Sequence, residues 1–201
     1  MTISWYGEAC FLIESGGTRI LIEPPQKESG INPPRLKSDI LIYSKSRGNA
    51  AAFNESAGET FIIDTAGEYE IKGINILGIN SDDNILYSIK IDDIKIAHLG
   101  FLNKELDNDQ LTLLDDPDII LIPVGGSEIL DAEKAMGVIS QVEPRVAIPM
   151  LYGIKDLKIK RAPLKDFLKE SEAKDAPQPK LTIKKKDLTE EETKIVILEK
   201  V

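Results

Sequence analysis

The sequence has very few of the side chains that bind transition metals: one histidine, His98, and one cysteine, Cys10, in 201 residues. Zinc is held mostly by imidazole, thiolate and carboxylate groups, and a site for two zinc ions takes about six of them. A single cysteine also excludes an internal disulfide. The composition therefore excludes a histidine-rich metal centre and a disulfide framework.

Long apolar runs are absent as well. No stretch approaches the ~20 residues of a membrane helix, and the N-terminus has no basic segment followed by an apolar one, so we expect neither a membrane segment nor a signal peptide. The chain has 25 Lys and Arg against 34 Asp and Glu. Because sequence-independent nucleic-acid binding depends on basic residues, we expect a cytoplasmic protein without a nucleic-acid or membrane partner.

The hydrophobic content, 42%, is sufficient for one domain with a sizeable core. Alternating apolar residues and turn signals predict strands throughout the first half, including one long strand over 68–79. After residue 100 the pattern alternates between helix and strand, with helices predicted over 104–114, 131–142 and 163–169; Asp131 is the expected N-cap of the second. This order of elements predicts a layered sandwich with helices outside two sheets.

Several segments resemble those of the metallo-β-lactamase-fold hydrolases, specifically the ascorbate-6-phosphate-lactonase-like "Zn-dependent hydrolases". They are ISWYGEACFLIE (3–14), ILIEP (20–24), GEYE (67–70), HLG (98–100), IPVGG (122–126) and IPMLY (148–152). The resemblance implies a four-layer αββα sandwich in which residues 1–201 form one domain with two pseudo-symmetric halves, 1–100 and 101–201. It also implies a hydrolase with a dinuclear zinc site.

The chain departs from this family at the metal ligands. After the strand at 39–43 the family has H-x-H-x-D-H, whereas this chain reads SKSRGN. The bridging aspartate of H-x-G-D and the last histidine of I-P-M-H are also replaced. The degenerate positions are Ser44, Ser46, Gly48, Asn49, Phe101 and Leu151. We therefore expect no metal, no cofactor and no catalytic residue of the family type.

A second group of residues is expected to remain near the mouth of the old pocket. His98 is expected to be a core histidine that is hydrogen-bonded to the backbone, and the charged members form either a solvated rim or a lip for a small anion. The residual pocket comprises Glu8, Lys45, Arg47, Glu68, His98 and Tyr152.

These observations favour a metal-free pseudo-hydrolase that is retained as a binding or subunit-interaction protein. Its expected partner is a second copy of itself or an active paralogue, and its small-molecule ligand is unknown. The alternative is a lactonase-like or phosphodiesterase-like hydrolase that acts without the usual dinuclear zinc site. Its general base and polarising group would come from Glu68, His98, Cys10 and Lys45. A third possibility is a one-metal hydrolase with carboxylates or Asn49 as ligands.

Overall fold

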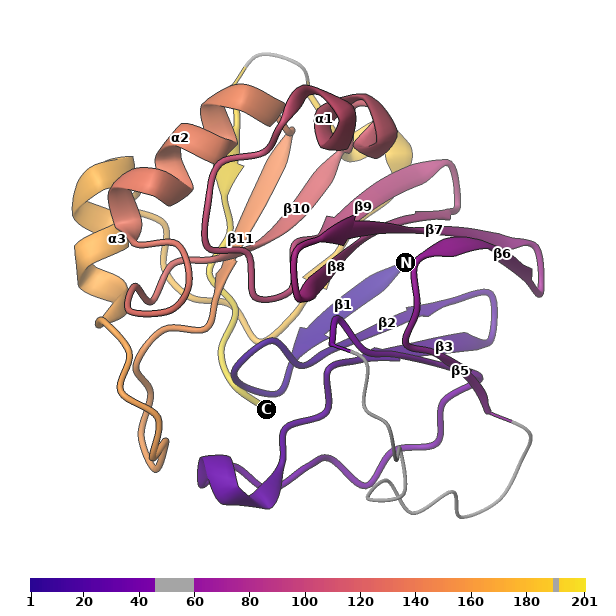
Figure 1. Cartoon of the computed structure of the whole chain (residues 1–201), viewed down its shortest axis with the longest axis horizontal. Helices are drawn as coiled ribbons and strands as arrows, with labels where there is room; N and C mark the ends of the chain where they lie inside the picture. The colour runs from indigo at the N-terminus through magenta and orange to yellow at the C-terminus, as the bar shows by residue number, and fades with distance from the viewer. Residues whose placement is uncertain (46–59, 190–191) are drawn as a thin grey trace.

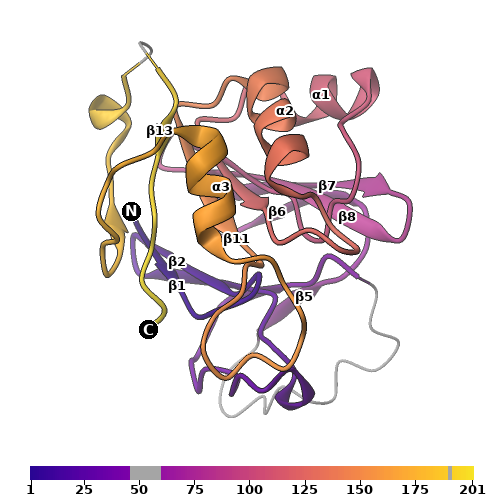
Figure 2. The same ribbon diagram turned by 90° about the vertical axis from the view of Figure 1, so that its left-hand side faces the viewer.

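The computed structural model describes residues 1–45, 60–189 and 192–201. Two sheets lie face to face, and the three α-helices of the described residues lie over the outer face of one of them (Figures 1 and 2). The first sheet contains β1 (Thr2–Trp5), β2 (Phe11–Ser15), β3 (Thr18–Ile22), β4 (Ile40–Ile42), β5 (Phe61–Ile63) and β12 (Leu181–Thr182). Its strand order is β12-β1-β2-β3-β4-β5.

The second sheet has the order β13-β11-β10-β9-β8-β7-β6. Its strands are β6 (Gly67–Ile71), β7 (Ile74–Ser81), β8 (Asn84–Ile91), β9 (Ile94–His98), β10 (Ile119–Pro123), β11 (Val146–Met150) and β13 (Lys194–Ile195). The helices are η1 (Lys27–Ser29), α1 (Asn108–Leu114), α2 (Ala132–Val142), α3 (Leu164–Ser171) and η2 (Lys185–Asp187). The expected layered α/β sandwich of two sheets is confirmed.

The period-2 pattern of the first sheet divides its side chains between two apolar clusters. Alternate residues such as Phe11, Ile13 and Ile20 belong to the main core between the sheets. Their neighbours Leu12 and Leu21 belong to a smaller cluster on the other face, which Leu36 helps to cover; that cluster also contains Cys10, Leu41 and Tyr43. Both faces of the sheet are therefore apolar, and Cys10 lies on the face that points away from the second sheet.

Two expectations about local structure have different outcomes. Asp131 caps α2 as expected, because its carboxylate accepts a hydrogen bond from the Lys134 N–H at 2.9 Å. The single strand expected over 68–79 is wrong. The chain instead forms the hairpin β6–β7, whose turn residues Lys72 and Gly73 both have positive φ, 54° and 76°. Two adjacent residues with positive φ are typical of a tight hairpin turn.

The three α-helices end in the same unusual way. Each is followed by an acidic residue in the left-handed conformation: Asp115 after α1, Glu143 after α2 and Glu172 after α3. Glycine is the residue that usually occupies this position.

No helix of the described residues is long and apolar enough to cross a membrane.

A buried hydrogen bond between Tyr87 and Tyr43 joins the two sheets through the core. The Tyr87 hydroxyl of β8 donates to the Tyr43 carbonyl at 2.8 Å, and burial raises the pKa of Tyr87.

We expect Tyr87→Phe to lower the free energy of unfolding by about 1–3 kcal/mol, since the buried carbonyl loses a donor. Urea unfolding measures this. Tyr69→Phe, which removes an exposed hydroxyl bonded to Thr65, should change stability by less than about 0.5 kcal/mol; equal losses in both variants would contradict the prediction.

Candidate active site

The parallel strands bring several chain segments to one edge of the sandwich. β10 runs parallel to β9 and β11, so the carboxyl ends of these strands lie at the same edge. The turn between β1 and β2 reaches this edge too, because the Leu151 N–H donates to the Glu8 carbonyl at 3.3 Å. In α/β sheets this edge is where ligands usually bind.

Two residues of this edge have backbones that L-residues rarely adopt. Glu8 has a φ of 49° and Leu151 a φ of 59°. The Glu8 carbonyl accepts a second hydrogen bond from the indole Nε1 of Trp5 at 2.8 Å, and this bond supports the turn. Left-handed backbone at residues other than glycine costs free energy, and such strain is concentrated at functional sites.

Glu8 forms an ion pair with Arg161, a residue 153 positions away. Nη2 of Arg161 lies 3.3 Å from Oε2 of Glu8, and the two side chains are each only 8% exposed. Two backbone hydrogen bonds place Arg161 here: Ala162 N–H donates to the Gly125 carbonyl at 2.7 Å, and Gly153 N–H donates to the Ala162 carbonyl at 2.8 Å. The arginine therefore comes from the connection after β11.

The pair leaves one donor and one acceptor free. Oε1 of Glu8 and Nε of Arg161 are buried and have no hydrogen-bond partner among the described residues. Burial raises the pKa of Glu8, and the guanidinium of Arg161 only partly offsets this effect. A carboxylate with a raised pKa beside a fixed cation can accept a proton while the cation stabilises a developing negative charge.

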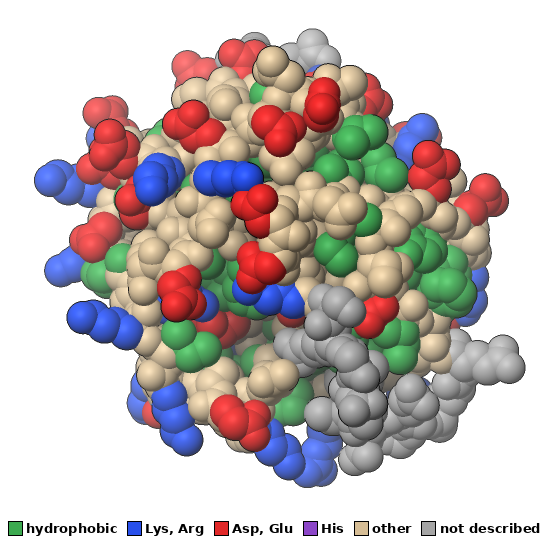
Figure 3. Space-filling view, viewed as in Figure 1, with side chains coloured by type: hydrophobic (Ala, Val, Ile, Leu, Met, Phe, Trp, Pro, Cys, Tyr) green, Lys and Arg blue, Asp and Glu red, His purple; other side chains and the backbone are tan. Residues whose placement is uncertain are grey.

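The surface is hollowed at this edge. Figure 3, in the orientation of Figure 1, shows a hollow near the ends of β1 and β11, with acidic and hydrophobic atoms at its floor. Tyr152, from the expected residual pocket, packs here with its ring centroid 4.9 Å from that of Trp5. Burial raises the pKa of Tyr152, so its phenol stays protonated near neutral pH.

Two other residues expected in a residual pocket, Glu68 and Lys45, do not converge on Glu8. Glu68 lies on the outer face of β6, beside a separate cavity of about 440 Å³ that Leu77 and Lys90 also line. Lys45 forms an ion pair with Asp83 at 2.8 Å and lies 5.4 Å from the centre of the Phe101 ring. Arg47 lies outside the described residues.

His98 is fully buried and both of its ring nitrogens are engaged. Nε2 lies 3.1 Å from the Ala9 carbonyl, and Nδ1 accepts a hydrogen bond from the Gly100 N–H at 3.1 Å. This pattern places the proton on Nε2 and matches the expected core histidine. Cys10 is also buried, and burial raises the pKa of its thiol well above the usual value. Neither group is placed to act as a base or nucleophile.

Three of the expected ligand positions, Ser44, Phe101 and Leu151, lie among the described residues, and their side chains are not of the kinds that hold zinc. Ser44 is fully buried, its N–H donates to the Glu23 carboxylate, and its hydroxyl has no partner among the described residues. Leu151 is fully buried and Phe101 partly so. Ser46, Gly48 and Asn49 lie outside the described residues. Within residues 1–45, 60–189 and 192–201, no three His, Cys, Asp or Glu side chains come together as a metal site.

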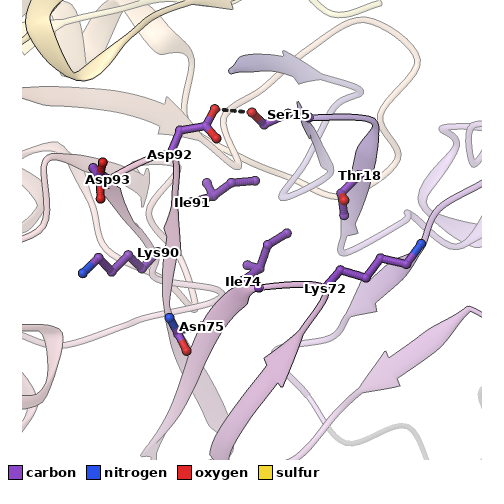
Figure 4. Close-up of a pocket in the computed structure, with 11 residues that line it drawn as sticks. Ser15, Thr18, Lys72, Ile74, Asn75, Lys90, Ile91, Asp92 and Asp93 are labelled. Atoms are coloured by element: carbon purple, nitrogen blue, oxygen red, sulfur yellow. Dashed lines mark hydrogen bonds between the residues drawn. The ribbon is translucent and has the colours of Figure 1, made fainter.

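A further cavity lies at the opposite edge of the sandwich, where β3 and β9 begin. It has a volume of about 470 Å³ and is lined by hairpin turns of both sheets. Figure 4 shows the Ser15 hydroxyl hydrogen-bonded to Asp92, with Lys72 and Lys90 pointing away from each other. No pair of acid and base converges in this cavity, so the Glu8–Arg161 edge is the better candidate site.

Comparisons with known proteins identify the family. The family model described as "Beta-lactamase superfamily domain" matches residues 2–151. The chain therefore belongs to the beta-lactamase superfamily. A structure from Thermotoga maritima, of a candidate Zn-dependent hydrolase of the metallo-β-lactamase superfamily, is 30% identical, with a TM-score of 0.83 and 98% of each chain covered.

Two further relatives are more distant. A protein of Thermoplasma acidophilum that is named a metal-dependent hydrolase is 26% identical, over 78% of this chain and 85% of its own. The structure of a metallo hydrolase from Ignicoccus hospitalis has the same fold, with 18% identity, a TM-score of 0.68, and 98% of this chain and 94% of that chain covered. These names contradict the expectation of a non-catalytic, metal-free binding protein, and the alternative expectation of a hydrolase agrees better with them.

The environment of His98 gives a test of the site's interior. Burial lowers the pKa of His98 to about 4 from its ordinary value of 6.5. Since the chain has one histidine, its imidazole signals can be followed by NMR without assignment. We expect them not to titrate between pH 8 and pH 5. A titration midpoint near 6.5 would show an exposed ring and contradict the structure.

The same shift predicts a loss of stability in acid. The unfolded chain binds a proton at His98 below pH 6.5, whereas the folded chain does so only near pH 4. The contribution of His98 to the free energy of unfolding is therefore fully present above pH 6.5. It falls as the pH decreases towards 4, by about 3 kcal/mol in total. Urea unfolding at pH 7 and pH 4.5 measures this loss. The free energy of unfolding of the His98→Gln variant should decrease less over the same pH interval.

Proposed function

We propose that this chain is a hydrolase of carboxylic esters or lactones that acts without the usual dinuclear zinc site. The observation that carries the proposal is the buried Glu8–Arg161 pair at the strand-end edge, in which one oxygen and one nitrogen have no hydrogen-bond partner in the described part of the chain. Membership of the beta-lactamase superfamily and the relatives named as hydrolases support the reaction class. The site residues that support it are Glu8 and Arg161, with Tyr152 and Trp5 as the neighbouring wall.

The proposed reaction needs one proton acceptor and one cation. Oε1 of Glu8 takes a proton from a water molecule while the water oxygen adds to the carbonyl carbon of the substrate. The carbonyl oxygen becomes negatively charged, and the guanidinium of Arg161 stabilises it. When the intermediate collapses, the bond between the carbonyl carbon and the alkoxy oxygen breaks, and the leaving oxygen receives the proton from Glu8.

The ester class follows from the number of charges at the site. A tetrahedral intermediate of acyl transfer carries one new negative charge, which the single guanidinium matches. Phosphoryl transfer spreads more charge over the equatorial oxygens, and metal ions usually neutralise it. Carboxylic esters and lactones are therefore the better match to a site with one arginine, and phosphodiesters the poorer one.

No measurement of the assembly of this chain is implied by its hydrolase chemistry, so its partner is a separate proposal. A second copy of the chain or an active paralogue remains the proposed partner, and light scattering after gel filtration measures self-association directly.

Substitution of the pair tests the proposal. With 4-nitrophenyl acetate and a δ-lactone as substrates, we expect Glu8→Gln to lower kcat about 10²-fold or more, and Arg161→Met about 10²- to 10³-fold. Because burial raises the pKa of Glu8 above 4.5, activity of the parent chain should fall as the pH decreases through that raised value.

Glu14→Gln is the matched control, since it removes an exposed ion pair with Arg19 whose atoms are 3.1 Å apart. Its activity should equal that of the parent chain. Circular dichroism must show that Glu8→Gln is folded, because a broken buried ion pair can cost about 3–5 kcal/mol. A folded Glu8→Gln variant with unchanged turnover would disprove the proposed role of this residue.

Chelation separates this proposal from zinc-dependent chemistry. After dialysis against EDTA, we expect ester turnover to stay within about twofold of the starting value, since the donor set at the described ligand positions does not fit zinc. Elemental analysis of the same samples gives the metal content. Loss of turnover on dialysis, with recovery on addition of zinc, would contradict a reaction carried by Glu8 and Arg161 alone.

A further inference from the structure

The hairpin β6–β7 forms one edge of the second sheet. β6 is the last strand in the order of that sheet, and Figure 1 shows it at the side of the sandwich away from α2 and α3. Lys72 and Gly73 form a two-residue turn, so the closing pair Ile71 and Ile74 exchanges both of its backbone hydrogen bonds. Every second pair along the hairpin repeats this arrangement, so alternate residues of β6 bond to β7.

Glu68 and Glu70 point their backbone N–H and carbonyl groups away from β7, because they belong to the pairs in between. Glu68 lies opposite Leu77, and Glu70 lies opposite Asn75. In the described part of the chain, no backbone hydrogen bond reaches these outward groups. A row of such groups is what an added strand pairs with. β6 also contains neither proline nor lysine, which commonly protect an edge from such pairing.

The outer face of the hairpin is hollowed beside this edge. The cavity of about 440 Å³ there is lined by side chains of β6, β7 and β8. Glu68 and Glu70 are exposed on the edge strand, and neither forms an ion pair with a described residue. Leu77 lies beside them as a partly exposed apolar residue. Lys90 is on β8, two strands and therefore about 10 Å further from the edge.

The opposite face of the same edge is apolar. Tyr69 and Ile71 alternate with the two glutamates and pack against the core between the sheets. The ring of Tyr69 lies 6.3 Å from that of Phe61 on β5, and its hydroxyl is hydrogen-bonded to Thr65, which fixes the ring. Phe61 is 47% exposed. Every second side chain of an added strand would cover these rings.

We propose that the β6 edge binds an extended segment of a partner protein in which basic and apolar residues alternate. The segment adds antiparallel to β6, and its backbone bonds to the outward groups of Glu68 and Glu70. Its lysine or arginine side chains lie opposite the two carboxylates, and its apolar side chains cover Tyr69 and Phe61. This site is separate from the Glu8–Arg161 pair and does not depend on the proposed hydrolase chemistry.

The charges of β6 disfavour pairing between two copies of this strand. Two β6 strands side by side bring the glutamates of one copy next to those of the other, and like charges opposite each other destabilise a sheet. A basic side chain opposite each glutamate stabilises the pair instead. The net charge of −9 on the whole chain also increases the rate at which a basic segment associates.

Labelled peptides and fluorescence anisotropy test the site with the full chain. The probe is a fluorescein-labelled peptide of alternating lysine and valine. We expect it to bind about tenfold or more tightly than a peptide of alternating glutamate and valine. A peptide of the same composition, with its lysines and valines in two separate blocks, should bind about fivefold more weakly than the alternating one, because it cannot match both faces of the edge.

Backbone methylation of the peptide tests whether a strand is added. Because each lysine lies opposite a glutamate whose backbone groups point outward, the lysine N–H groups face β6 and the valine N–H groups face solvent. N-methylation of two central lysines should therefore abolish measurable binding. N-methylation of two central valines leaves the charge and composition the same and should change the affinity by less than about threefold.

A pair of protein variants locates the site. Glu68→Gln/Glu70→Gln should weaken binding of the alternating peptide about fivefold or more, since two exposed ion pairs are lost. Glu128→Gln/Glu133→Gln removes two exposed carboxylates outside β6 and should leave the affinity unchanged. Circular dichroism of both variants should match that of the parent chain.

Several outcomes would overturn the proposal. These are no binding of the alternating peptide, equal affinity for the basic and acidic peptides, equal effects of methylation at lysine and at valine, or equal affinity in the two protein variants. Light scattering after gel filtration identifies the remaining occupant. Self-association that Glu68→Gln/Glu70→Gln changes and Glu128→Gln/Glu133→Gln does not would assign the β6 edge to a second copy of the chain and overturn the assignment to a basic segment of another protein.

Discussion

The structure depends on the burial of two apolar sheet faces against each other. Residues such as Phe11 and Ile20 of the first sheet and Ile89 of the second share one core, and few polar contacts cross it. Once the faces are paired, the parallel strands of the second sheet must end together at one edge. The turn that contains Glu8 and the connection that contains Arg161 meet there because the strands before them are fixed.

The candidate site combines a strained backbone with an incompletely satisfied ion pair. Glu8 and Leu151 adopt left-handed conformations and share a backbone hydrogen bond. The two side chains of the ion pair are nearly buried, yet one acceptor and one donor of the pair have no partner among the residues that the structure describes. A purely structural ion pair is more stabilising when all its polar atoms are satisfied. The unsatisfied atoms are therefore consistent with a site that is completed by a ligand.

The sequence predicts features that depend on neighbouring residues and misses those that depend on distant ones. The Asp131 cap of α2 was predictable, since the aspartate and the N–H it accepts from are three residues apart. The β6–β7 turn was missed because Lys72-Gly73 is a weak turn signal within an apolar pattern. Glu68 was placed at the pocket by its motif, but the pleat turns it to the outer face. Arg161 was not predicted, because nothing near it in sequence indicates a contact with Glu8.

The ends of the three α-helices allow a different conclusion. Asp115, Glu143 and Glu172 all combine a left-handed backbone, which glycine adopts more easily, with a negative charge near the negative end of a helix dipole. None of them belongs to the turn that contains Glu8 or to the connection that contains Arg161. The fold therefore tolerates poor helix ends, and its thermal robustness could be increased at positions remote from the chemistry.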